Sequence, residues 1–209
     1  MTPADRAIAL EEFRRFAESR RSVRRYAGSP VPDSLLEAVL SAALSAPSPH
    51  NRQPVRLALI ERAETREKLV AAMGQRLRSD RTKDGDSPSV IERDIVGSRE
   101  RLLRAPVLLL VALSMNEMDR YPDSGRQQAE FLMAAQAAAM AGQNIALAAH
   151  AAGVASCWMC APVFCPELVA EVIGLPEDWR PQGLMTMGYA QGPARSRPRK
   201  ALEEILQRF

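Results

Sequence analysis

The hydrophobic and polar positions of the chain follow two periods, one typical of helices and one of strands. A helix is predicted to open at Pro32, because its apolar residues fall on one face: Leu36, Val39, Leu40, Ala43 and Leu44. Further helices are predicted over 65–78, from 88 to 104, over 126–152 and over 166–173. Strands are predicted at 55–60, 105–113, 154–159 and 183–189.

These elements differ in how they are expected to be buried. The run 105–113 is apolar almost throughout, as in a strand that is buried on both faces. The helix over 126–152 is rich in alanine and apolar on most sides, which indicates a central or interface helix. The polar stretch 80–88 contains Gly85 and Pro88 and is predicted to be a mobile surface loop. Helices interleaved with about four strands imply an α+β fold or a three-layer α/β/α sheet fold.

Length and composition set the class of protein. A chain of 209 residues with 46% hydrophobic residues suffices for one sizeable core, so we expect a single domain over 1–209. Charged residues interrupt the apolar positions of 1–16, which excludes the uninterrupted core of a signal peptide. The longest apolar run, 105–113, is too short to span a bilayer. We therefore expect a cytoplasmic protein with no membrane partner.

The charge balance argues against a nucleic-acid partner. The net charge is +3, but 28 basic residues are nearly matched by 25 acidic ones. Basic residues are not interleaved with aromatic ones, as they are in proteins that bind single strands. The excess indicates local sites for anions.

Three cysteines lie close together in the sequence. Cys157 and Cys160 have the spacing of a redox-active dithiol, while Cys165 has no further cysteine left to pair with. A catalytic dithiol and small buried cysteines on a strand are the two interpretations that remain open. No set of four zinc ligands is available, and we expect no metal.

A basic segment between two helices is the first candidate site. Arg20, Arg21, Arg24 and Arg25, together with the Ser22 hydroxyl, lie within six residues. Arginine side chains make bidentate, charge-assisted hydrogen bonds to phosphate oxygens, so this segment can hold a phosphate. A solvated basic turn is the alternative.

A proline-rich loop follows the next helix. Its prolines restrict the backbone of 46–54, which presents polar side chains in a defined arrangement: Ser48, His50, Asn51 and Gln53. The Asn51 amide donates and accepts at once, which matches the edge of a flavin pyrimidine ring.

The two segments, taken together, resemble the N-terminal signature of the nitroreductase family. The matching motifs are 20–24, 30–32 and 46–48, followed by Asn51, Gln53 and Pro54, and the likeness continues to Arg199. A tryptophan usually follows this last proline in the family, whereas here Val55 does. The resemblance implies the nitroreductase fold, FMN as the cofactor, and a domain-swapped homodimer in which both subunits line the flavin site.

The resemblance also assigns roles to individual residues. It implies that Arg20, Arg21, Ser22 and Arg24 contact the FMN phosphate, ribityl chain and pyrimidine edge. It implies that Ser48 and Asn51 contact the ring, that Trp158 and Met159 pass its N5 atom, and that Arg197 and Arg199 return to the phosphate, with Arg195 as a nearby alternative.

Within the family, the chain is most similar to the nitroreductase-like C-terminal domain of the two-domain enzyme that completes the deazaflavin coenzyme F-420. The motifs that carry this likeness include 121–123, 156–158, 174–176 and 188–190. It implies an acceptor such as the dehydro precursor of that coenzyme. We expect Arg78 and Arg81, beside the predicted loop 80–88, to bind its anionic tail.

Chemistry of this kind is carried by the cofactor. Hydride transfer in ping-pong fashion through flavin N5, from a donor such as NAD(P)H, requires no catalytic acid or base from the protein. A cation near the pyrimidine edge, for which Arg24 is the candidate, would stabilise the reduced flavin. The alternatives are a general NAD(P)H-dependent nitro- or quinone reductase and a flavin-binding protein without turnover.

Overall fold

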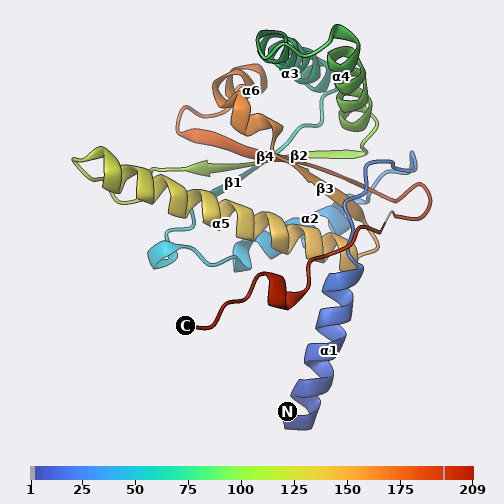
Figure 1. Ribbon diagram of the computed structural model, residues 1–209, viewed down its shortest axis with the longest axis vertical. Helices are drawn as coiled ribbons and strands as arrows, with labels where there is room; N and C mark the ends of the chain where they lie inside the picture. Colours follow the sequence, from blue (N-terminus) through green and yellow to red (C-terminus); the bar gives the residue numbers. More distant parts are fainter. Residues whose placement is uncertain (1–2, 195) are drawn as a thin grey trace.

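Helices and strands alternate along the chain, and the computed structural model, which describes residues 3–194 and 196–209, gives their bounds (Figure 1). The helices are α1 (Pro3–Ser19), α2 (Asp33–Ser41), α3 (Ala63–Lys83), α4 (Pro88–Leu103), α5 (Ser124–Ala151) and α6 (Pro166–Ile173). The strands are β1 (Val55–Leu59), β2 (Val107–Ser114), β3 (Ala155–Met159) and β4 (Trp179–Gly188). Short 3-10 helices η1 (Ala42–Ser45), η2 (Pro49–Asn51), η3 (Ala161–Phe164) and η4 (Leu202–Glu204) connect them.

The four strands form one antiparallel sheet in the order β1-β2-β4-β3. In Figure 1, α3, α4 and α6 cover one face of this sheet, and α5 with α2 covers the other. The expected three-layer α/β/α arrangement is thereby confirmed. β2 is buried along its whole length, as its apolar run predicted.

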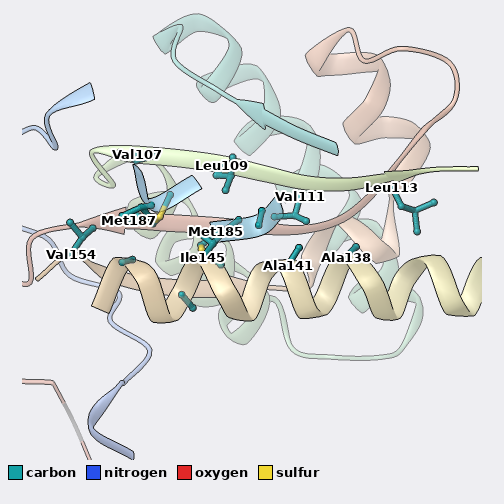
Figure 2. Packing of buried hydrophobic residues seen from close by; sticks show 14 of the residues in the cluster. Val107, Leu109, Val111, Leu113, Ala138, Ala141, Ile145, Val154, Met185 and Met187 are labelled. Carbon is teal, nitrogen blue, oxygen red and sulfur yellow. The ribbon is translucent and has the colours of Figure 1, made fainter. Parts of the chain in front are cut away.

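Alternate residues of β2 divide the core into two halves. Val107, Leu109, Val111 and Leu113 face α5, where small residues of the helix bring its backbone close to the sheet (Figure 2). The intervening residues Leu108 and Leu110 pack with α3, α4 and α6 on the other face. Both halves are held by burial of aliphatic side chains, each of which contributes about 1.5–3 kcal/mol.

The central helix α5 begins at a capped N-terminus. The Asp123 carboxylate accepts a hydrogen bond from the Arg126 backbone N–H at 2.9 Å, which satisfies one of the free amides of the first turn. By length and composition α5 resembles a membrane span, but it lies along the sheet and buries its small residues there, as a core helix of a folded protein does.

The predicted mobile loop 80–88 was wrong in its extent. Helix α3 continues to Lys83, so only residues 84–87 connect it with α4. Ion pairs within and around the last turns hold the helix: Arg76 pairs with Asp80 at 2.7 Å, and Arg81 pairs with Asp86 at 2.6 Å. The sequence pattern is polar there because these turns face solvent, and polarity was mistaken for a loop.

Candidate functional site

A cavity of about 470 Å³ lies between α5, β3, β4 and the basic segment that follows α1. Small residues of α5 leave this space open on one side, because a larger side chain at each position would fill it. The described residues that line it include three of the predicted site residues, Arg20, Ser22 and Trp158. The remainder of its wall is formed by Ala135, Ala139, Gly142, Gln143, Ala146, Ser156, Cys160, Gln182 and Met185.

The basic segment is attached to the outer edge of β3. Ser22 forms a parallel bridge with Ser156, and the Val23 backbone N–H donates to the Ser156 carbonyl at 3.0 Å. A second bridge joins Tyr26 to Ala190, after the end of β4. The segment therefore continues the sheet at its edge, and this pairing brings Arg20 to the cavity.

Tyr26 anchors the basic segment to β4. Its ring is buried, and its hydroxyl oxygen lies 2.6 Å from the Val23 carbonyl and 2.7 Å from Thr186 Oγ1. Burial raises the pKa of the Tyr26 hydroxyl, so the group stays neutral and can donate to the carbonyl. The phosphate-binding candidates are thus held by a hydrogen bond that persists over the whole ordinary pH range.

Trp158 occupies a slot that two glycines leave open. A Cβ atom built on Gly183 of β4 would lie 2.4 Å from Trp158 Cζ2, closer than any real contact. The indole Nε1–H donates to Cys160 Sγ at 3.1 Å. The ring is therefore fixed between α5 and β4, where its edge forms part of the cavity wall.

Two glutamines of the cavity were missed by the sequence argument. Gln143 is a polar residue among the small residues of α5, and this isolated polar side chain could have indicated a functional position in the sequence. Gln182 lies at a β-bulge, because Gly183 pairs with Val111 and Pro181 with Ala112, which leaves Gln182 without a partner in β2. Bulges re-aim side chains and are frequent beside active sites. No sequence pattern indicated this bulge.

The loop with Ser48 and Asn51 has an unusual backbone. His50, Asn51 and Gln53 all have positive φ values, of 47°, 56° and 49°, which residues other than glycine adopt rarely. The Ser48 hydroxyl oxygen accepts a hydrogen bond from the Gln53 backbone N–H at 2.9 Å, which holds the loop in this form. Such conformations are concentrated at functional sites.

Other predicted site residues lie outside the cavity of the single chain. Ser48 and Asn51 are not among its described lining residues, and neither are Arg21 and Arg24. The Met159 side chain packs against the half of the core that α3, α4 and α6 cover, and Met159 is not among the described lining residues of the cavity.

The predicted phosphate contacts near the C-terminus follow the last strand. Arg197 and Arg199 are exposed in the tail that runs below α5 in Figure 1. Arg195 lies outside the described residues. Neither arginine is among the described residues that line the cavity.

Arg78 and Arg81 belong to α3, on the face of the sheet opposite α5 (Figure 1). Arg78 pairs with Glu92 of α4 at 2.7 Å, and Arg81 pairs with Asp86 and Asp94. Both guanidinium groups thus join α3 to α4 and the short connection between them. The structure does not bring them to the cavity that Arg20 lines.

The three cysteines are free thiols, with Cys160 exposed and the other two buried. Burial raises the pKa of the Cys157 thiol, which disfavours the thiolate that a catalytic dithiol requires. Of the two interpretations, small buried cysteines therefore describe Cys157 and Cys165. Cys160 is the one thiol among the described residues that faces the cavity.

Comparison with known proteins places this arrangement in a family. The model of the "Nitroreductase family" matches residues 17–189. An NADH dehydrogenase of Thermus thermophilus is 48% identical over 60 residues, a stretch that covers 28% of this chain and 29% of that protein. A protein of Bacillus subtilis, provisionally named an NAD(P)H nitroreductase, is 23% identical over 180 residues, covering 85% of this chain and 84% of that one.

A solved structure has the same fold over its full length. It is a provisionally assigned nitroreductase of Desulfovibrio desulfuricans, crystallised in complex with FMN, and it is 24% identical. It superposes with a TM-score of 0.69 and covers 100% of this chain and 98% of its own. At this identity, the likeness concerns the fold.

Proposed function

The chain belongs to the nitroreductase family and is an FMN-dependent oxidoreductase, and from this premise we propose that it transfers hydride from NAD(P)H to a small quinone or nitroaromatic acceptor. The single observation that carries the proposal is the cavity at Arg20, Ser22 and Trp158, because it combines a cationic side chain with a wall of small and aromatic residues. The deazaflavin precursor is the narrower candidate for the acceptor.

The residues of the cavity fit FMN. Its volume of about 470 Å³ lies within the range of about 300–1,000 Å³ typical of ligand pockets. Arg20 supplies a charge for the terminal phosphate, and the Ser22 hydroxyl supplies a further donor. The alanines of α5 that line the cavity let a flat ring approach the helix closely, which a larger side chain would prevent, while Gly142 makes room for the Trp158 indole.

Bound FMN supplies a ring that takes up hydride from one substrate and gives it to the next. The protein's own residues bind and orient: Arg20 and Ser22 hold the phosphate end, and the amides of Gln143 and Gln182 can donate to and accept from ring or substrate edges. The Trp158 indole closes the wall against water. No described side chain needs to gain or lose a proton.

A homodimer would complete this site. α5 exposes Phe131, Leu132 and Met140, and the tail beneath it exposes Leu206 and Phe209, an amount of apolar surface that a second copy would cover. Ser48 and Asn51 lie on the same layer of the molecule as this surface, since η2 contacts α5. We propose that they, together with Arg197 and Arg199, reach the flavin site of the partner subunit.

The acceptor is the least constrained part of the proposal. A deazaflavin precursor with an anionic tail would need cations at the mouth of the site, and Arg78 and Arg81 were the candidates. Their ion pairs with Glu92 and Asp94 on the far face of the sheet favour the small acceptor. The location in the cytoplasm, like the single domain over 1–209, stays a prediction.

One set of measurements tests the proposal. The purified protein should release FMN on denaturation, and NADH or NADPH should bleach the bound flavin without oxygen before a quinone restores its colour. A protein that binds no FMN would contradict the site, whereas one that binds FMN but is bleached by neither nucleotide would contradict the donor. Steady-state kinetics of the parent protein with a small quinone and with the deazaflavin precursor then decide the acceptor: a higher kcat/KM for the quinone supports the proposal, and a higher kcat/KM for the precursor contradicts it.

A further inference from the structure

A second cavity lies on the face of the sheet away from the flavin site, between α3, α4 and the turn η3. Its volume is about 290 Å³, and we call it the α3–α4 recess. Its wall is apolar and is formed mainly by Val70, Met73, Leu77, Ile95, Leu102 and Phe164. No described residue that lines the flavin cavity lines this recess.

The floor of the recess is already ordered by the protein core. Val70, Met73, Leu102 and Cys165 are all buried members of the core half that α3 and α4 cover. Side chains fixed in this way need no rearrangement to receive a ligand, which lowers the cost of binding. The volume lies at the lower limit of known ligand pockets, so it suits a ligand smaller than a drug molecule or a cofactor.

The charges at the mouth identify the polar end of such a ligand. Arg76 is engaged with Asp80, and Arg81 with Asp86 and Asp94. Arg99 lines the mouth, is exposed, and takes part in no ion pair among the residues that the structure describes. Its guanidinium group is therefore available, and it matches a carboxylate with two parallel hydrogen bonds.

We propose that the α3–α4 recess binds small amphipathic carboxylates, with a short alkyl or aryl body in the recess and the carboxylate on Arg99. Asp84, also at the mouth, is the group that would instead attract an ammonium head. Ligands that share one apolar chain and differ only in carrying a carboxylate or an ammonium group therefore test the proposal directly. The site is separate from the flavin cavity and does not depend on the proposed reaction.

The test compares octanoate, octan-1-ol and octylamine by calorimetric titration of the FMN-loaded protein, in which the first cavity is filled. Octanoate should bind most tightly. Arg99→Ala should weaken octanoate about tenfold, as expected for the loss of one charge-assisted contact, and leave octan-1-ol unchanged. Arg93→Ala is the matched control, since this exposed arginine of the same helix does not line the recess.

A filling variant provides a second criterion. Ser98 also lines the recess, and Ser98→Phe should abolish binding of all three probes. If this variant does not fold, the Arg99→Ala comparison decides alone. The proposal is overturned if octylamine or octan-1-ol binds as tightly as octanoate, if Arg93→Ala and Arg99→Ala lose affinity equally, or if octanoate does not bind at millimolar concentration.

Discussion

Gly142 of α5 and Trp158 of β3 are packed so closely that a Cβ atom built on the glycine would lie 2.4 Å from Trp158 Cζ3. The three nearest atoms it would meet all belong to the rigid indole, which is itself confined by Gly183. The two residues are therefore fitted to one another, and the wall of the candidate flavin site depends on both.

Gly142→Ala should displace the indole into the cavity. We expect FMN affinity to decrease at least about tenfold and stability to fall by about 1–3 kcal/mol, as for an overpacked core. Flavin fluorescence titration and urea unfolding measure the two effects. Gly97→Ala on α4 is the control: its built Cβ meets only the flexible Arg101 side chain, at 3.5 Å, so it should stabilise by about 0.5–1 kcal/mol. Equal changes of FMN affinity and stability in both variants would contradict the close packing of Gly142 against Trp158.

Arg20→Ala should weaken FMN binding about tenfold to a hundredfold, because one charge-assisted contact to the phosphate is lost. Riboflavin, which has no phosphate, should bind the variant and the parent equally. Arg25→Ala serves as the control, since Arg25 is exposed in the same segment but does not line the cavity. An FMN affinity that is the same in Arg20→Ala as in the parent would show that Arg20 is a solvated turn residue.

His150 should make the protein less stable in mild acid. Burial, with help from the charges of Arg20 and Arg21, lowers the pKa of His150 below its ordinary value of 6.5. The unfolded chain then binds the proton more readily than the folded one, so the stability contributed by neutral His150 is present above pH 6.5 and is lost as the pH falls through the lowered pKa. Urea unfolding at several pH values between about pH 5 and about pH 7.5, a range that includes the ordinary pKa of histidine, measures how the free energy of unfolding depends on pH.

His150→Gln is the matched variant, since it removes the titrating group but keeps a side chain that can hydrogen-bond Ser19, whose hydroxyl oxygen lies 2.6 Å from Nε2. Its stability should depend less on pH than that of the parent. Identical slopes in the two proteins would assign the acid sensitivity to other groups.

Arg66 is expected to be a main determinant of stability. Its guanidinium group donates hydrogen bonds to three backbone carbonyls: that of Ile60, after the end of β1, at 2.6 Å, and those of Ala105 and Pro106, before the start of β2, at 2.8 Å and 3.2 Å. Arg66 thereby links the end of β1 to the start of β2. Arg66→Ala leaves these acceptors without their donor and should lower the free energy of unfolding by about 2–4 kcal/mol. Arg62→Ala, at an exposed position one turn earlier, should change it by less than about 0.5 kcal/mol. A loss of similar size in both variants would refute the assignment.

The sequence predicted the layers well because the apolar pattern reports burial directly. The strand at 105–113 and the helix at 166–173 were found with nearly correct bounds, since each has an unambiguous period or run. The extent of α3 was missed because its last turns are held by ion pairs on a solvated face, and a polar surface helix has no apolar stripe there.

The site was predictable only in part. Arg20, Ser22 and Trp158 could be named because they belong to short local motifs. Gln182 could not, since it enters the cavity through a bulge in the pairing of β2 with β4, a property of register that no single strand encodes. The positions of Arg78 and Arg81 depended on the layer to which α3 belongs, which the linear order of elements does not give.

The order of strands has a consequence for how the chain is made. β2 lies in the middle of the sheet but pairs on one side with β4, which is synthesised only after α5, β3 and α6. Until Trp179–Gly188 leaves the ribosome, the run Val107–Ser114 has one unpaired edge of continuous apolar sequence, which is the kind of segment that aggregates. The nascent protein therefore completes its sheet late, and its yield in cells should be limited by how well this one strand is protected during synthesis.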